Sequence, residues 1–189
     1  MVRATLPWAR RMLHGMRKTL LLTLVCVAAA GLAACSPVFN WREVRPDDTA
    51  LSVLLPCKPD KAQQTVPMGG RPTALTLLGC DAGGAAFAVA VVDIGQAGPV
   101  PAVLAQWQAV TLAGIKAANS TTTVVTVPGA LTAPPPVLVR ALGHRPDGSA
   151  VHSHALYFAH GTQVFQVVML ASTVTPEAAD MFFSSARLK

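Results

Sequence analysis

The sequence predicts an α+β fold, in which an antiparallel sheet of about six to seven strands carries two packed helices. Two observations support this prediction. Short segments that are apolar or alternating outnumber amphipathic ones, and glycine-containing turns of hairpin length separate most of them, which favours antiparallel pairing. Helical spacing of apolar residues occurs in only two long segments, within 99–119 and 175–189.

The first 34 residues have the features of a secretory signal peptide. An apolar run of sixteen residues, 19–34, is shorter than the roughly 20 residues that a membrane-spanning helix needs. The run follows a cationic segment without acidic residues, whose basic members are Arg3, Arg10, Arg11, Arg17 and Lys18. A signal that starts late in this segment would still function, so three methionines are candidate starts: Met1, Met12 and Met16.

The end of this run, Leu32-Ala33-Ala34-Cys35, resembles the lipobox of bacterial lipoproteins. In that family the cysteine thiol receives diacylglycerol and the signal is cut before it, so the resemblance implies a lipid attached to Cys35. An Asp after the cysteine favours the inner membrane in that family. Ser36 at this position therefore implies an outer-membrane anchor that faces the periplasm, in preference to the inner membrane. An ordinary signal peptide cut near Ala34, which would leave a soluble periplasmic protein, is the alternative.

The mature chain is expected to be one domain on a short tether. Residues 35–48 are interpreted as the lipidated N-terminus and tether, with Trp41 docking on the body, and residues 49–189 as a single α+β domain. Five of the fifteen Lys and Arg residues leave with the signal, so the mature chain carries ten basic and nine acidic residues. The ten are scattered, which argues against a nucleic-acid partner.

Two cysteines remain once Cys26 leaves with the signal and Cys35 takes the lipid. In an oxidising compartment Cys57 and Cys80 are expected to form a disulfide. A two-cysteine metal or redox site is the alternative, although the spacing is not that of a CxxC motif.

Strands are expected where apolar or β-branched residues gather between turns. Their ranges are 50–56, 73–80, 85–94, 121–127, 137–144, 150–160 and 163–172, with a short edge strand at 63–67. On the third of these, Ala86, Ala88 and Ala90 make a face small enough for a helix to lie close. The turn 145–148, with Pro146 and Gly148, suits a type I turn with a bulge.

The two helices have different signals. Leu104, Trp107 and Val110 recur at helical spacing within 99–119. The second helix is expected to start at Thr175-Pro176-Glu177, with a hydroxyl N-cap, proline at the first position and a carboxylate in the first turn. It is expected to continue through 178–189 and to end on basic residues.

Several of these segments together resemble a known group of proteins. The strand end LLPCKPD, the meander ALYFAHGTQVFQVVML and the closing helix AADMFFSSARL are similar to small PsbP-like and DcrB-like envelope proteins. The similarity spans most of residues 50–188 and rests on element order, not on a chemical motif. It implies an antiparallel sheet with packed helices, and a role in binding or assembly, because members of this fold are mostly binding or assembly factors.

The one constellation that suggests ligand chemistry is a set of histidines. Residues two apart on a strand share a face, so His152 and His154 point the same way. If the 145–148 turn sets the register, His144 joins them, and three imidazoles are a ligand set for Zn or Cu. The same register puts Arg140 near His154, where it would repel a cation, so solvated strand histidines are the simpler interpretation.

No catalytic arrangement is apparent. The nine carboxylates are dispersed, and neither a G-x-S-x-G motif nor a phosphate-binding glycine loop is present. The expected function is therefore that of a non-enzymatic, lipid-anchored envelope protein without a cofactor beyond its lipid. Its partners would be membrane lipid and an envelope protein. A periplasmic Zn- or Cu-binding module that uses His144, His152 and His154 is the alternative.

Overall fold

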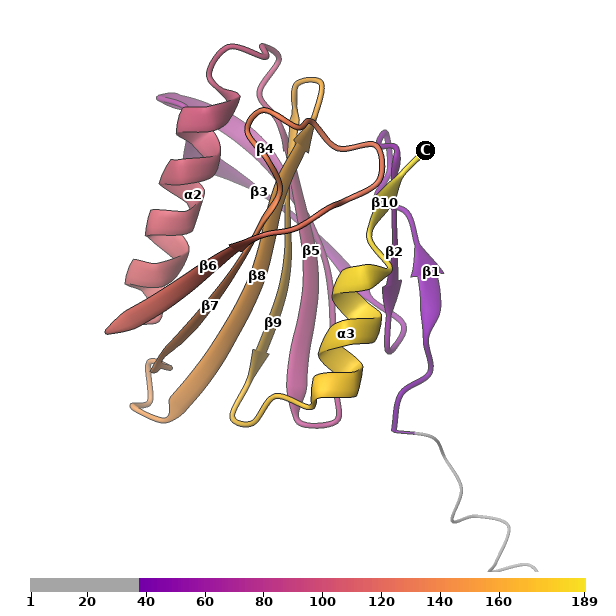
Figure 1. Cartoon of the computed structure of the whole chain (residues 1–189), viewed down its shortest axis with the longest axis vertical. Coiled ribbons are helices and arrows are strands. Elements are labelled where there is room, and N and C mark those ends of the chain that lie inside the picture. The colour runs from indigo at the N-terminus through magenta and orange to yellow at the C-terminus, as the bar shows by residue number, and fades with distance from the viewer. Residues whose placement is uncertain (1–37) are drawn as a thin grey trace, which may run out of the picture. The chain divides into compact units, whose positions relative to one another are not determined.

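The computed structural model describes residues 38–189, which form two antiparallel sheets and two helices (Figure 1). This confirms the predicted α+β class with antiparallel pairing and two helices. The signal peptide and the lipobox with Cys35 lie outside the described residues. The elements in chain order are β1 (Arg42–Val44), β2 (Leu51–Leu55), β3 (Asp60–Met68), β4 (Arg71–Ala82), β5 (Ala85–Asp93), α2 (Val100–Gly114), β6 (Asn119–Val124), β7 (Val137–His144), β8 (Ala150–His160), β9 (Gln163–Ala171), α3 (Pro176–Ser184) and β10 (Arg187–Leu188).

The larger sheet has seven strands in the order β3-β4-β5-β9-β8-β7-β6. It consists of two meanders, β3 to β5 and β6 to β9, which meet where β5 pairs with β9. Helix α2 and the segment after it carry the chain from the end of the first meander to the far edge of the sheet. Tight turns join the strands within each meander except β6 and β7, which the longer segment 125–136 connects. Gly69-Gly70 and Gly83-Gly84 supply the positive φ angles that two of these turns need.

A smaller sheet, β1-β2-β10, lies apart from the larger one. The segment 51–55, expected as a strand of a single sheet, is the central strand here. Its residues Leu51, Val53 and Leu55 are fully buried because they face the core of the larger sheet. Both ends of the described chain join this sheet, since β1 and β10 flank β2.

The compact unit includes residues 38–48, which precede the boundary at residue 49 that the sequence suggested. Residues 42–44, expected in the tether, pair with β2 as β1. Aromatic packing explains the difference. The rings of Phe39 and Trp41 lie edge-on to Phe87, with centroids 6.3 and 6.2 Å away, and bury apolar area that a free tether would expose.

The seven-stranded sheet has a hydrophobic core on each face. Helix α2 covers one face, where Ala90 and Val92 of β5 meet Val103 and Trp107. Of the three alanines expected to make room for a helix, Ala90 lies in this core, whereas Ala86 and Ala88 are only partly buried and line a shallow hollow with Cys57 and Cys80. Helix α3 and the smaller sheet cover the other face, over Phe87, Phe158 and Phe165. Figure 1 shows the larger sheet between α2 on the left and α3 with the smaller sheet on the right.

One buried polar bridge fastens α2 to the sheet. The Gln166 side-chain amide donates hydrogen bonds to Tyr157 Oη and to Thr111 Oγ1, both at 2.9 Å. Tyr157 and Gln166 are buried on β8 and β9, and Thr111 belongs to α2. The bridge therefore satisfies polar atoms that would otherwise be costly to bury.

Helix α3 ends earlier than predicted. Thr175 is the N-cap residue and Pro176 the first helical residue, but the Thr175 side chain makes no capping hydrogen bond. The last turn carries no basic residue, because the chain leaves the helix after Ser184 and residues 187–188 pair with β2 as β10. Arg187, expected at the helix end, instead contacts Glu43 of β1 at 3.2 Å.

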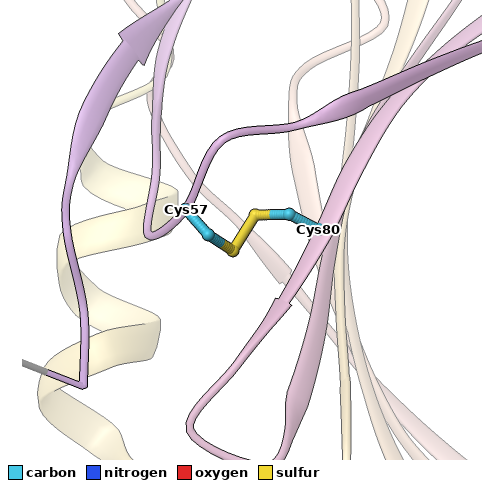
Figure 2. Close-up of a disulfide and its surroundings, with 2 residues drawn as sticks. All are labelled: Cys57 and Cys80. Carbon is cyan, nitrogen blue, oxygen red and sulfur yellow. A yellow bond between two sulfur atoms is a disulfide. The ribbon is translucent and has the colours of Figure 1, made fainter.

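The disulfide joins the two layers. Cys57 follows β2 and Cys80 lies in β4, and their sulfur atoms are 2.07 Å apart (Figure 2). The bond thus ties the end of the smaller sheet to an inner strand of the larger one.

Candidate functional site

The register of the β7–β8 hairpin is the one that the 145–148 turn predicted. Arg140 pairs with His154, Leu142 with His152 and His144 with Ala150. His152 and His154 therefore share one face of β8. Arg140 lies on the same face, on the neighbouring strand β7, which separates β8 from the edge strand β6.

This arrangement does not gather three metal ligands. Residues 38–189 contain no group of three or more His, Cys, Asp or Glu side chains placed to hold a metal ion. His144 lies at the end of its strand, diagonal to His152, and the nearest charged neighbour of His154 across the ladder is the cationic Arg140. The residues that are present suit an anion better than a metal cation.

The surroundings of His154 are partly apolar. The His154 ring lies 6.4 Å from that of Phe183 on α3, tilted by 33°. Burial, followed by the positive charges of Arg140 and His152, lowers the pKa of His154 below its usual value of 6.5. At neutral pH the imidazole is therefore mainly neutral.

This pKa shift predicts a contribution to stability that depends on pH. The unfolded chain binds a proton near pH 6.5, whereas the folded chain resists protonation of His154. Above the pKa that His154 has in the unfolded chain, this contribution to the free energy of unfolding is fully present. It is lost as the pH falls from there through the lower pKa that His154 has in the folded chain. The charged and titratable groups that face His154 are Arg140 of β7, His152 of β8 and Asp180 of α3.

Urea unfolding between about pH 7.5 and about pH 5 measures this contribution. We expect His154→Gln to flatten the decline of the unfolding free energy on the acidic side. Arg140→Gln should flatten it only in part, because burial is the largest cause of the shift. An equal decline in wild type and His154→Gln would contradict the assignment.

His154 and Arg140 line a cleft of about 620 Å³ between α3 and strands β7 and β8, here called the α3 cleft. Its third wall is the segment 125–127, which follows β6. Most of the lining is apolar, from Val125, Val127, Leu138, Leu156, Val174, Pro176, Ala179 and Phe183. The polar lining consists of Thr126, Arg140, His154, Asp180 and Ser184.

A second, shallower depression of about 330 Å³ adjoins the α3 cleft on the same face and is called the outer hollow. It extends over β6, β7 and β8, and it shares Arg140 and His154 with the cleft. Arg140 thus stands where the two depressions meet. The ion pairs found in residues 38–189 do not include this guanidinium, which is exposed.

The outer hollow ends at β6, an edge strand of the larger sheet. Every residue of β6 is exposed, and its sequence NSTTTV contains neither a charge nor a proline. The opposite edge, β3, carries Asp60, Lys61 and Pro67. Charges and proline are the usual protection of a sheet edge against added strands, so β3 has this protection and β6 lacks it.

Two further arginines, Arg71 and Arg145, lie outside the α3 cleft. Arg71 donates a hydrogen bond to the Ile94 carbonyl at 2.8 Å, and Arg145 belongs to the β7–β8 turn. Sequence reasoning missed Asp180, Phe183 and Thr126, because only the packing of α3 and of the segment after β6 brings them into the cleft that Arg140 also lines.

Comparisons with known proteins give little help with this geometry. No family model and no curated protein matches the chain. Among solved structures, it is similar to a protein of unknown function from Pseudomonas aeruginosa, PA94, at 12% sequence identity and a TM-score of 0.31. The match covers 73% of this chain and 85% of that one, and a likeness this slight carries no argument about function. Within residues 38–189, no helix is long and apolar enough to span a membrane.

Proposed function

We propose that this protein is a non-enzymatic, lipid-anchored module of the bacterial envelope that holds an extended segment of another envelope protein. Acylated Cys35 would fix it to the outer membrane, facing the periplasm. The anchor confines the domain to one surface and so raises its effective concentration near other envelope components. Several acyl chains hold stably, whereas one chain holds only weakly.

The open edge at β6 is the observation that supports a protein partner. An edge strand presents unpaired backbone N–H and C=O groups that an extended peptide can bind. Two apolar side chains near this edge are exposed, Val124 at 66% and Leu142 at 50%, but they lie at opposite ends of β6 and on opposite faces of the sheet. The support for a partner therefore comes from the open backbone edge itself and not from an apolar patch.

The proposal is tested by a photo-crosslinking residue in place of Thr122 of β6, in cells that express the protein at its native level. We expect it to capture a defined protein from the membrane fraction. The matched control is the same residue at Gln64 of the protected edge β3, where no capture is expected. The intact mass of the protein from that fraction should correspond to a chain that begins at acylated Cys35.

Blocking the edge gives a second measurement in the same cells. The pair Ser120→Lys and Thr122→Lys places charges on an exposed strand without removing a core contact, and we expect it to abolish capture from a crosslinker at Val124. Equal capture from β6 and β3, capture that survives the lysines, or a mass without acyl chains would each contradict the proposal.

Zinc or copper binding by the pair His152 and His154 is the second candidate, because the described residues do not bring His144 into a three-ligand group with them. His152 and His154 support this candidate because they line the same hollow. Arg140 weakens it, because its positive charge lies opposite His154 and would repel a metal cation. Retention of Zn by the purified native protein, and its loss in His152→Ala with His154→Ala, would favour this candidate instead.

A further inference from the structure

The α3 cleft has an apolar body and one cationic end. Leu138 and Leu156 form its floor on β7 and β8, and Phe183 and Ala179 form the wall on α3. Its volume, about 620 Å³, lies within the range of roughly 300–1,000 Å³ that is usual for small-molecule sites. A ligand that fills this body must therefore be largely apolar.

The cationic end is Arg140. A guanidinium presents a planar fork of N–H donors that matches the oxygens of a carboxylate or a phosphate. The Arg140 side chain is exposed, and none of the ion pairs found in residues 38–189 includes it. It therefore has donors to offer to an anion that reaches the junction of the cleft and the outer hollow.

The remaining charges give the ligand an orientation. Asp180 and Ser184 lie on the α3 wall, opposite the strands. A carboxylate there repels an anionic group close to α3 and leaves the Arg140 end as the favourable place for it. The half-buried His154 lines the cleft next to both Arg140, its partner across the β7–β8 ladder, and Phe183 on α3.

We propose that the α3 cleft binds a single-chain amphiphile with an anionic head group, its head on Arg140 and its tail along Leu138, Leu156 and Phe183. This site is distinct from the β6 edge, so either proposal can fail without the other. The head is a carboxylate or a phosphate, two groups that the guanidinium recognises by the same fork of hydrogen bonds.

A photoreactive dodecanoate with a diazirine in its tail, added to membranes that contain the native acylated protein, tests the site. We expect labelling to map to peptides from α3, β7 and β8. In Arg140→Gln the half-saturating concentration should rise about tenfold, as expected for the loss of a charge-assisted hydrogen bond. Arg42→Gln, which removes the same charge from exposed β1, should leave it unchanged.

Competition on the wild-type protein separates the possible ligands. Dodecyl phosphate should displace the probe, whereas dodecanol and dodecyltrimethylammonium, with the same tail and no anionic head, should displace it about tenfold less well. Equal displacement by dodecanol would overturn the role of Arg140. Displacement by inorganic phosphate alone would overturn the role of the tail. Labelling spread evenly over both faces of the sheet, with capture at β6 intact, would overturn this inference and leave the proposed function standing.

Discussion

Replacement of Phe182 by alanine is expected to lower the free energy of unfolding by about 3–5 kcal/mol. Phe182 is fully buried in α3, and its ring packs edge-on against Phe87 of the sheet with centroids 5.2 Å apart. The substitution leaves a cavity between helix and sheet, where the neighbouring aromatic rings cannot collapse into the space. Urea unfolding followed by circular dichroism measures the loss.

Met181 provides the matched control for this variant. It is the preceding residue of the same helix and is 47% exposed, so Met181→Ala should change the unfolding free energy by no more than about 0.5 kcal/mol. Similar losses in the two variants would show that helix propensity, not burial against Phe87, determines the effect. Because α3 forms one wall of the cleft, Phe182→Ala should also weaken labelling by the photoreactive dodecanoate.

Removal of the disulfide is expected to cost about 3 kcal/mol of unfolding free energy in the chain-entropy account. The bond closes a loop between residues separated by 23 positions, and its loss gives the unfolded chain more freedom. The variant with both Cys57→Ala and Cys80→Ala should unfold at a lower urea concentration than the oxidised protein. Reduction should bring the wild type to a similar midpoint and leave the double variant unchanged. A wild-type midpoint that is insensitive to reduction would contradict this expectation.

The features that could be predicted from the sequence are those that local chemistry determines. The β7–β8 register follows from one turn, since Pro146 and Gly148 define the loop and every pair after it, including Arg140 with His154. Ala90 of β5 likewise marks the sheet face that α2 covers, although Ala86 and Ala88 on the same face lie outside that core. In both cases the residues that matter are close together in the chain or alternate along one strand.

The features that could not be predicted depend on contacts between distant segments. The smaller sheet pairs Ser52 with Arg187, so the strand character of β10 comes from a partner at the other end of the chain, while its sequence continues a helical pattern. The cleft has the same origin. In the sequence, Arg140 is simply an arginine on a predicted strand. An apolar pocket lies beside it only because α3 packs on the sheet through Phe182.

The disulfide also has a mechanical consequence. A pull on the N-terminal end of the folded unit acts first on Phe39, Trp41 and the three-residue strand β1, which can peel from β2 one pair at a time. Cys57 stops this peeling, because Cys80 lies in β4, which is held between β3 and β5. A force that is transmitted past Cys57 acts on β4 and the long strands paired with it, where many hydrogen bonds must break together. The domain can thus yield at β1, and further at the cost of withdrawing Leu51, Val53 and Leu55 from the core, while the strands that carry Arg140 and the β6 edge stay paired.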